Sequence, residues 1–247
     1  MKITGMHSHR FAHTLVQHVP ELSELWTDLL STIEGISDDD IVKAFTAPNE
    51  TVSDYRFWTD GRAVGTELSL SVSINNLLKQ RLEKLGWDAE SGIFQEPSYS
   101  KKSETRWRLD FSKTIPLADE DTGEVLGETG IAVEVAFNHG EAIAWNLLKP
   151  VMAAELNHVS KELHLGEGIG VVICASAELK KAGAFDSSVG EYEKFLRYLR
   201  PMRNQLTVPM MIIGLGAPDS FTIQKKSVKK EREKWGRESI GIVTLNA

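Results

Sequence analysis

The chain has 247 residues, of which 41% are hydrophobic and 26% charged, proportions typical of a globular protein with a substantial core. Its net charge of −7 argues against indiscriminate binding to polyanions, and no apolar run approaches the roughly 20 residues that span a bilayer. The amino terminus lacks an apolar signal-peptide core, which predicts a cytoplasmic protein, and the single cysteine, Cys174, excludes an internal disulfide and a cysteine-rich zinc site.

The amino-terminal part of the chain is predicted to hold one short strand and three helices. Residues 3–9 fit a strand, and apolar side chains at helical spacing predict a helix from about His13 to Leu30. The polar and acidic residues 34–65 are expected to form loops around one short helix, from Asp39 to Phe45. A clearer helix runs from Ser73 to Leu85 and is ended by a glycine.

Four histidines near the start of the chain suggest a zinc site. Zinc ligands must converge on one point, whereas these side chains would span a strand, a bend and the beginning of a helix. Ordinary surface or packing roles are therefore the preferred interpretation for all four: His7, His9, His13 and His18.

Two segments with the alternation of half-buried strands, 106–113 and 130–139, form the centre of the predicted fold. Glu134 is a lone carboxylate in the apolar second strand, where an unpaired buried charge costs several kcal/mol, so a bound cation is expected beside it. If the strands are neighbours, Asp110 and Glu134 can converge on a hard metal ion such as Mg²⁺. A structural salt bridge from Glu134 to Arg106 or Arg108 is the equally open alternative.

The segment between the two strands is strongly acidic. Residues 116–130 contain five Asp or Glu side chains and no basic one, and Asp121–Glu124 has the composition of a hairpin turn. We expect a protruding hairpin whose carboxylates are solvated.

The carboxyl-terminal half predicts alternating helices and buried strands. A long helix, Glu141 to Leu163, should be kinked at its proline, and a shorter one runs from Val189 to Met202. Nearly all-apolar runs predict buried strands at 168–174, 208–215 and 240–245. The order of elements describes a mixed sheet with helices on both faces.

No linker or repeat interrupts this order, so residues 1–247 are interpreted as one domain. A basic carboxyl-terminal segment, 225–237, has seven Lys or Arg against two Glu. It could meet phosphates, although a charge run is more often a solvated surface.

An Asp on one strand, a Glu-Val on the next and a following helix resemble the PD-(D/E)XK nuclease core. The closer resemblance is to type II restriction endonucleases of the BglII and BstYI type, which cut at GATC-centred sites. Asp110–Lys113 resembles that family's Asp-Phe-x-Lys, and Val133–Phe137 resembles its Val-Glu-Val-Gln-Phe. Asp186–Glu193 resembles its Ser-Ser-x-x-Tyr-Tyr-Glu segment.

The resemblance implies an α/β, restriction-endonuclease-like core, a mixed β-sheet flanked by helices on both faces. It implies a Mg²⁺-dependent, sequence-specific endonuclease that hydrolyses phosphodiester bonds of double-stranded DNA at a short palindrome, with GATC as a candidate core. Such enzymes act as homodimers, and a cognate DNA methyltransferase is expected as a genetic partner. Carried over residue by residue, the resemblance makes Asp110 and Glu134 the catalytic metal ligands and gives DNA contacts to four residues: Asn138, His139, Ser187 and Ser188.

Two departures from the family pattern follow. The family's Asp and Glu are closer in sequence than Asp110 and Glu134, so the acidic hairpin would be an insertion. Ala136 stands where the family has Lys, Gln or Glu, and a methyl group can neither orient a water nor donate to a phosphate. Either another side chain reaches in, or the chain is a catalytically idle DNA-binding relative. A protein-interaction domain with the acidic hairpin as its contact is a third interpretation. The side chains that could reach in and replace the missing polar group at position 136 are Glu90, Lys113 and Asn138.

Overall fold

Six strands form a mixed sheet at the centre of the molecule, in the order β1-β7-β6-β5-β4-β3. Strands β3, β4 and β5 are antiparallel neighbours, β5, β6 and β7 run parallel, and β1 is antiparallel to β7. The computed structural model describes residues 1–46, 64–65, 67–94, 107–119, 121–155, 168–229 and 237–246. The strands are β1 (Ile3–His9), β3 (Asp88–Gly92), β4 (Arg108–Ala118), β5 (Val125–Val135), β6 (Ile169–Ala175) and β7 (Met210–Leu215).

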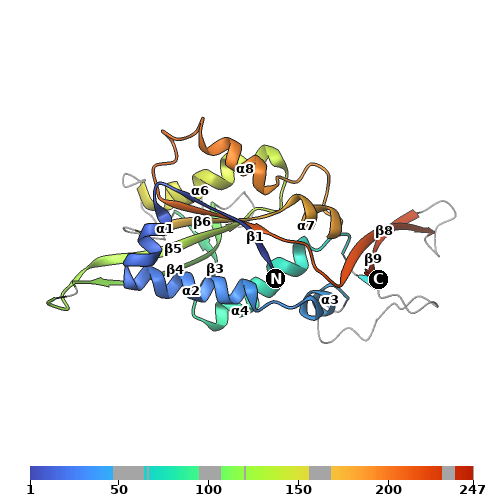
Figure 1. Ribbon diagram of the computed structural model, residues 1–247, viewed down its shortest axis with the longest axis horizontal. Coiled ribbons are helices and arrows are strands. Elements are labelled where there is room, and N and C mark those ends of the chain that lie inside the picture. The colour runs from blue at the N-terminus through green and yellow to red at the C-terminus, as the bar shows by residue number, and fades with distance from the viewer. Residues whose placement is uncertain are drawn as a thin grey trace.

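Helices cover both faces of this sheet (Figure 1). Helices α2 (Pro20–Glu34) and α4 (Ser71–Lys84) pack on one face, and α6 (Ile143–Glu155) and α8 (Tyr192–Leu199) pack on the other. The expected fold class, a mixed β-sheet flanked by helices on both faces, is confirmed. The shorter helices are α1 (Ala12–His18), α3 (Asp38–Thr46), the 3-10 turn η1 (Gly140–Ala142) and α7 (Ala177–Ala182).

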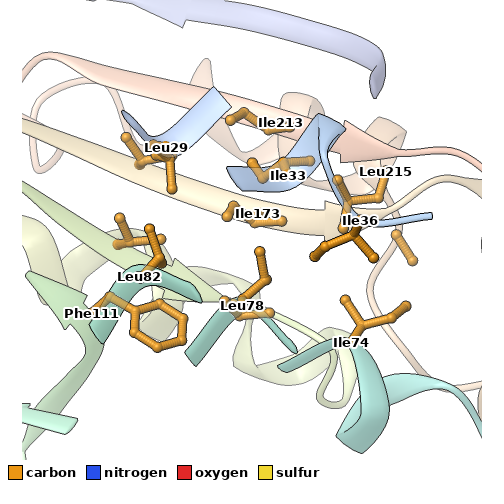
Figure 2. Packing of buried hydrophobic residues seen from close by; sticks show 14 of the residues in the cluster. Leu29, Ile33, Ile36, Ile74, Leu78, Leu82, Phe111, Ile173, Ile213 and Leu215 are labelled. Atoms are coloured by element: carbon orange, nitrogen blue, oxygen red, sulfur yellow. The ribbon is translucent and has the colours of Figure 1, made fainter. Parts of the chain in front are cut away.

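The larger apolar core lies between the sheet and the pair α2 and α4. Figure 2 shows side chains of the two helices meeting those of β4, β6 and β7. Each buried Leu or Ile contributes roughly 1.5–3 kcal/mol relative to an exposed one, so this layer fixes the sheet on which the polar residues stand. The residues labelled there are Leu29, Ile33, Ile36, Ile74, Leu78, Leu82, Phe111, Ile173, Ile213 and Leu215.

Helix α6 approaches the opposite face of the sheet very closely. All of β6 is buried, as expected for a central parallel strand covered on both faces. A Cβ added at Gly170 would lie 2.7 Å from Pro150 Cβ, so the absence of a side chain there permits the contact. This contact fixes the part of α6 that faces the carboxyl end of β5.

Two structures extend beyond the layered core (Figure 1). Strands β4 and β5 continue past the helices as a long hairpin, paired as far as Ala118 and Val125. A three-stranded sheet, in the order β2-β9-β8, lies at the other end of the molecule. Its strands are β2 (Val64–Gly65), β8 (Phe221–Lys229) and β9 (Arg237–Leu245).

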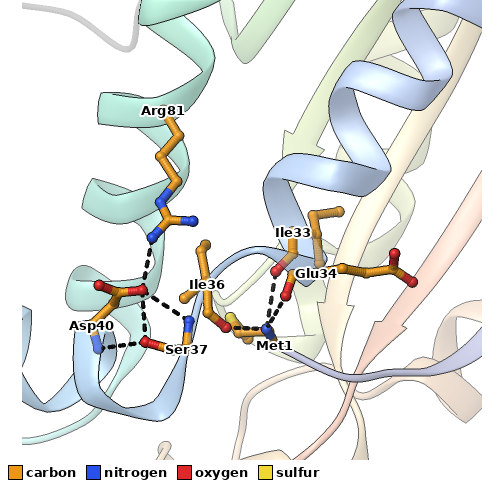
Figure 3. Close-up of polar contacts among 7 residues, drawn as sticks. All are labelled: Met1, Ile33, Glu34, Ile36, Ser37, Asp40 and Arg81. Atoms are coloured by element: carbon orange, nitrogen blue, oxygen red, sulfur yellow. Dashed lines mark hydrogen bonds and ion pairs between the residues drawn. The ribbon is translucent and has the colours of Figure 1, made fainter.

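Polar contacts join the start of β1 to α2, and α3 to α4 (Figure 3). The amino-terminal ammonium group donates to the carbonyl oxygens of Ile33, Glu34 and Ile36. Arg81 of α4 pairs with Asp40 at 2.7 Å, and the same carboxylate accepts from Ser37. These hydrogen bonds hold the pKa of Asp40 below its ordinary value, chiefly through Ser37.

Some expected elements differ from those observed. The helix expected over 13–30 is broken at Val19, which has an extended conformation (φ −99°, ψ 110°) because Pro20 disfavours a helical residue before it. The strands β2, β3 and β8 were not expected, and β9, which includes the strand expected over 240–245, pairs with β2 and β8 in a separate sheet rather than in the main one. Helix α6 is described as far as Glu155, and the rest of the expected helix, 156–163, lies outside the described residues. Within the described ranges, no helix combines the length and apolarity that crossing a membrane requires.

Candidate active site

Asp110 and Glu134 lie beside each other on neighbouring strands. The expectation that their two strands are neighbours is confirmed, because β4 and β5 pair antiparallel. The register that joins Phe111 to Val133 places Asp110 next to Glu134, and the backbone N–H of Val135 donates to Asp110 Oδ2 at 2.7 Å. The two carboxylates therefore share the end of the hairpin that is buried in the fold.

Glu134 is a buried acid with only one satisfied oxygen. Its side chain is 3% exposed, and Oε1 accepts a hydrogen bond from Lys149 Nζ at 2.5 Å. Its other oxygen, Oε2, is buried and has no hydrogen-bond partner among the described residues. Burial, and then the charge of Asp110, raise the pKa of Glu134 to about 8, although Lys149 acts in the opposite direction. A buried carboxyl oxygen that no donor faces is suited to a bound metal ion.

The pKa of Asp110 is also raised. Burial is the main cause, and the hydrogen bond from Val135 opposes it. Among the residues that the structure describes, no set of three His, Cys, Asp or Glu side chains could hold a metal ion. The donor set is thus two carboxylates, and it fits Mg²⁺, which usually binds through one or two carboxylates, waters and substrate phosphate oxygens.

Lys149 is the site residue that sequence reasoning missed. A salt bridge from Glu134 to Arg106 or Arg108 was the alternative to a metal site, and within the described residues Glu134 pairs with Lys149 of α6. Arg108 pairs with Glu90 at 2.9 Å, and Arg106 lies outside the described residues. One signal was present in the sequence, because Lys149 is the only charged residue between Ile143 and Ala154.

The candidates for the role of the missing third residue are placed differently. Ala136 is fully buried, and its N–H donates to the carbonyl of Ile173 at 2.7 Å. Lys113 contacts Leu85 O at 2.8 Å and Asp28 at 3.4 Å, on the face covered by α2 and α4. Its amine therefore points away from the carboxylate pair.

The other two candidates are nearer the pair. Glu90 is exposed and bound to Arg108, and its negative charge contributes to the raised pKa of both carboxyl groups, after burial as the main cause. Asn138 accepts a hydrogen bond at 2.8 Å from the amide of Asn146, a fully buried residue of α6. Neither side chain approaches Glu134 in the way that Lys149 does.

The two segments expected to contact DNA meet beside this site. Ser188 Oγ donates to Asp186 Oδ1 at 2.6 Å and lies 2.5 Å from His139 Nδ1. Backbone contacts tie the same segments together, including an isolated bridge between His139 and Val189. Ser187 belongs to this loop, and its carbonyl accepts from Lys180 Nζ at 2.7 Å. A rim of polar groups from 138–139 and 186–188 results.

The basic strand β8 is near this rim. The pKa of Asp186 is lowered, chiefly by the hydrogen bonds from Ser188 and to a smaller extent by the charges of His139 and Lys225. The first part of the basic segment expected over 225–237 thus lies in β8, while residues 230–236 are outside the described part of the chain.

Of the four early histidines, His9 contacts Leu206 O and His13 contacts Ser8, each at 2.9 Å.

Comparisons with known proteins find similarity to restriction endonucleases. Residues 4–215 match the family model described as restriction endonuclease BglII/BglIII. The crystal structure of restriction endonuclease BglII complexed with a DNA 16-mer is similar over 100% of both chains, with a TM-score of 0.55 and 14% sequence identity. Free BglII matches over the same extent with a TM-score of 0.43 and 12% identity. Among curated proteins, none has a significantly similar sequence.

Proposed function

Since the chain belongs to the restriction endonuclease BglII/BglIII family, we propose that it is a Mg²⁺-dependent type II endonuclease. Its substrate is double-stranded DNA, cut at a short palindromic site for which GATC is a candidate core. The observation that carries the proposal is the buried pair Asp110 and Glu134, with an oxygen of Glu134 left unpartnered. A carboxylate pair on two paired strands supplies the ligands that phosphodiester hydrolysis with a divalent metal requires.

Asp110 and Glu134 would hold the metal ion. Glu134 Oε2 has no hydrogen-bond partner in the part of the chain that the structure describes, and Asp110 keeps one oxygen beyond the one bound to Val135. The chemistry that Mg²⁺ supplies in such a site is activation of a water molecule and neutralisation of charge at phosphorus. The protein's part is to hold both carboxylates rigidly on adjacent strands, so that they need no rearrangement when DNA arrives.

The rim beside the pair would read the DNA sequence. Asn138 and His139 follow β5, and Ser187 and Ser188 come from the loop hydrogen-bonded to them. Asparagine can pair with the edge of adenine in the major groove, and serine is a less selective partner. The close connection between carboxylates and rim would couple recognition to cleavage.

A palindromic site requires a two-fold protein, so the active form would be a homodimer. A chain that cuts a short site would also cut the DNA of its own cell. A cognate methyltransferase is therefore the expected genetic partner.

A catalytically idle DNA-binding relative is the second candidate. Ala136 favours it, because this buried methyl group can neither donate to a phosphate nor orient a water. In that case the chain would bind DNA in the presence of a divalent ion and leave it intact.

Incubation of unmethylated plasmid and phage DNA with the purified chain tests the proposal. We expect discrete fragments with Mg²⁺ and none in a parallel reaction with EDTA. Fragments of random length would contradict sequence specificity. Intact DNA under all conditions, together with retained binding in Ca²⁺, would favour the idle relative.

A further inference from the structure

Within the described part of the chain, the positive charge that contacts the carboxylate pair is that of Lys149, through its ion pair with Glu134. Building on the proposed nuclease function, we propose that Lys149 is the third polar group of this active site. In the metal-free protein it binds Glu134 Oε1 at 2.5 Å. With the carboxylates occupied by a divalent ion and DNA present, its ammonium group contacts the phosphate that is cut.

A nuclease of this kind needs a donor near the phosphate, and the strand does not provide it. The side chain at position 136 is a buried methyl group. Lys113 is bound on the other face of the sheet, and Asn138 is held by Asn146. Glu90 is negative and paired with Arg108. Among the described residues, Lys149 is the cation in contact with the pair.

The position of Lys149 on α6 suits this role. Pro150 packs against the bare backbone of Gly170, so the helix backbone beside Lys149 is held close to the sheet. The lysine side chain is 16% exposed, whereas that of Glu134 is 3% exposed. Lys149 thus lies on the solvent side of the ion pair, which is the side from which a phosphate must approach.

The chemistry of lysine also suits an exchange of partners. Its ammonium group has three donors on a flexible stem of four carbons, so it can leave one oxygen acceptor for another with little rearrangement. A divalent ion bound to Glu134 neutralises the carboxylate charge that attracts Lys149. The ammonium group can then bind the DNA phosphate instead.

The dependence of DNA affinity on salt distinguishes this role from that of a simple counter-ion. A lysine that contacts a phosphate adds about one to the slope of log affinity against log salt. We propose to measure this slope for the full chain on a labelled plasmid fragment, once in Ca²⁺ and once in EDTA. For Lys149→Met we expect a slope lower by about one per site in Ca²⁺ and an unchanged slope in EDTA, where the parent lysine is engaged with Glu134.

Cleavage in Mg²⁺ gives the second measurement. Loss of a preorganised donor to the reacting group costs about 100-fold or more, so Lys149→Met should lower single-turnover cleavage by that factor. Lys149→Arg, which keeps the charge, should lose less. Lys113→Met is the matched control, since it removes a lysine charge on the other face of the sheet and should leave slope and cleavage unchanged.

Each result has a defined meaning. Equal salt slopes for the parent and Lys149→Met in Ca²⁺, or cleavage by Lys149→Met at the parent rate, would overturn the role of Lys149. A parent chain that cuts no DNA would contradict the proposed function instead, and the slopes would still test the phosphate contact. If thermal unfolding shows that Lys149→Met does not fold, Lys149→Gln takes its place, because it keeps a donor to Glu134 without the charge.

Discussion

The two ends of the β4–β5 hairpin carry the same kind of side chain in opposite environments. At the buried end, Asp110 and Glu134 have raised pKa values because burial disfavours their charged forms. At the exposed tip, the pKa of Asp119 is lowered because the backbone and hydroxyl groups of Thr122 donate to it. The tip stabilises its charge with local donors, whereas at the buried end the effect of burial outweighs the hydrogen bonds from Val135 and Lys149. That contrast distinguishes the proposed cation site from a turn whose carboxylates are stabilised locally.

The largest expected effect comes from removing one carboxylate at the buried end. Asp110→Ala and Glu134→Ala should each reduce DNA cleavage in Mg²⁺ to the level of the EDTA control, because each removes a proposed metal ligand. The fold should survive, which thermal unfolding would check. Asp121→Ala at the tip is the control and should cut at the parent rate. Parent-like cleavage by either buried variant would disprove the assignment of the metal site.

The next effect concerns stability and pH in the absence of metal. Burial, and then the charge of Asp110, raise the pKa of Glu134 in the folded protein to about 8, whereas its ordinary pKa is 4.5. Between these values the folded state binds more protons than the unfolded state, so stability falls as pH rises. A tenfold difference in proton affinity between the two states corresponds to about 1.4 kcal/mol, which limits the loss of stability to a few kcal/mol.

Unfolding by urea in EDTA at pH 5 and pH 8 tests this. Glu134→Gln should lose less stability than the parent between the two pH values. Adding Ca²⁺ at pH 8 should stabilise the parent more than the variant, because the ion binds the folded carboxylates. A parent chain whose stability is the same at both pH values would show that Glu134 is already compensated.

The sequence predicted the part of this arrangement that depends on local pattern. The alternation of polar and apolar residues predicted that Asp110 and Glu134 lie on strands, and the pairing of those strands is confirmed. The break at Pro20 could have been foreseen from the proline itself, whereas β3 has no apolar alternation and exists through its pairing with β4. Lys149 could not be assigned to Glu134, because the two are joined only by the packing of α6 on the sheet.

A smaller effect is expected at the rim. Asp186 is similar to Asp119 of the tip, since a neighbouring hydroxyl group and N–H lower its pKa, yet it lies in the polar rim next to His139. Ser188→Ala would remove the hydroxyl that joins Asp186 to His139. We expect roughly tenfold weaker discrimination between the cognate site and sites with one changed base pair.

The ratio of cleavage rates on the two kinds of site is the measurement for Ser188→Ala. Asp119→Ala, which alters the equivalent aspartate at the tip, should leave the ratio unchanged. Equal ratios for the parent and Ser188→Ala would remove the rim from the recognition surface.

The smallest effect is expected at Ala136, where the family pattern is broken. If Lys149 supplies the missing donor, Ala136→Gln should leave cleavage unchanged or lower it, because the larger side chain crowds a fully buried position. In the Lys149→Met background the same change should raise cleavage, because the glutamine amide then restores a donor beside the phosphate. DNA affinity in Ca²⁺ should change little in either background, since in the proposed site residue 136 would lie under the phosphate and away from the bases. A large loss of affinity would mean that the face of the chain with residues 134 and 136 does not lie under the phosphate. Glu134 would then be excluded from the proposed cation site, and the buried end of the hairpin would no longer differ from its tip in this respect.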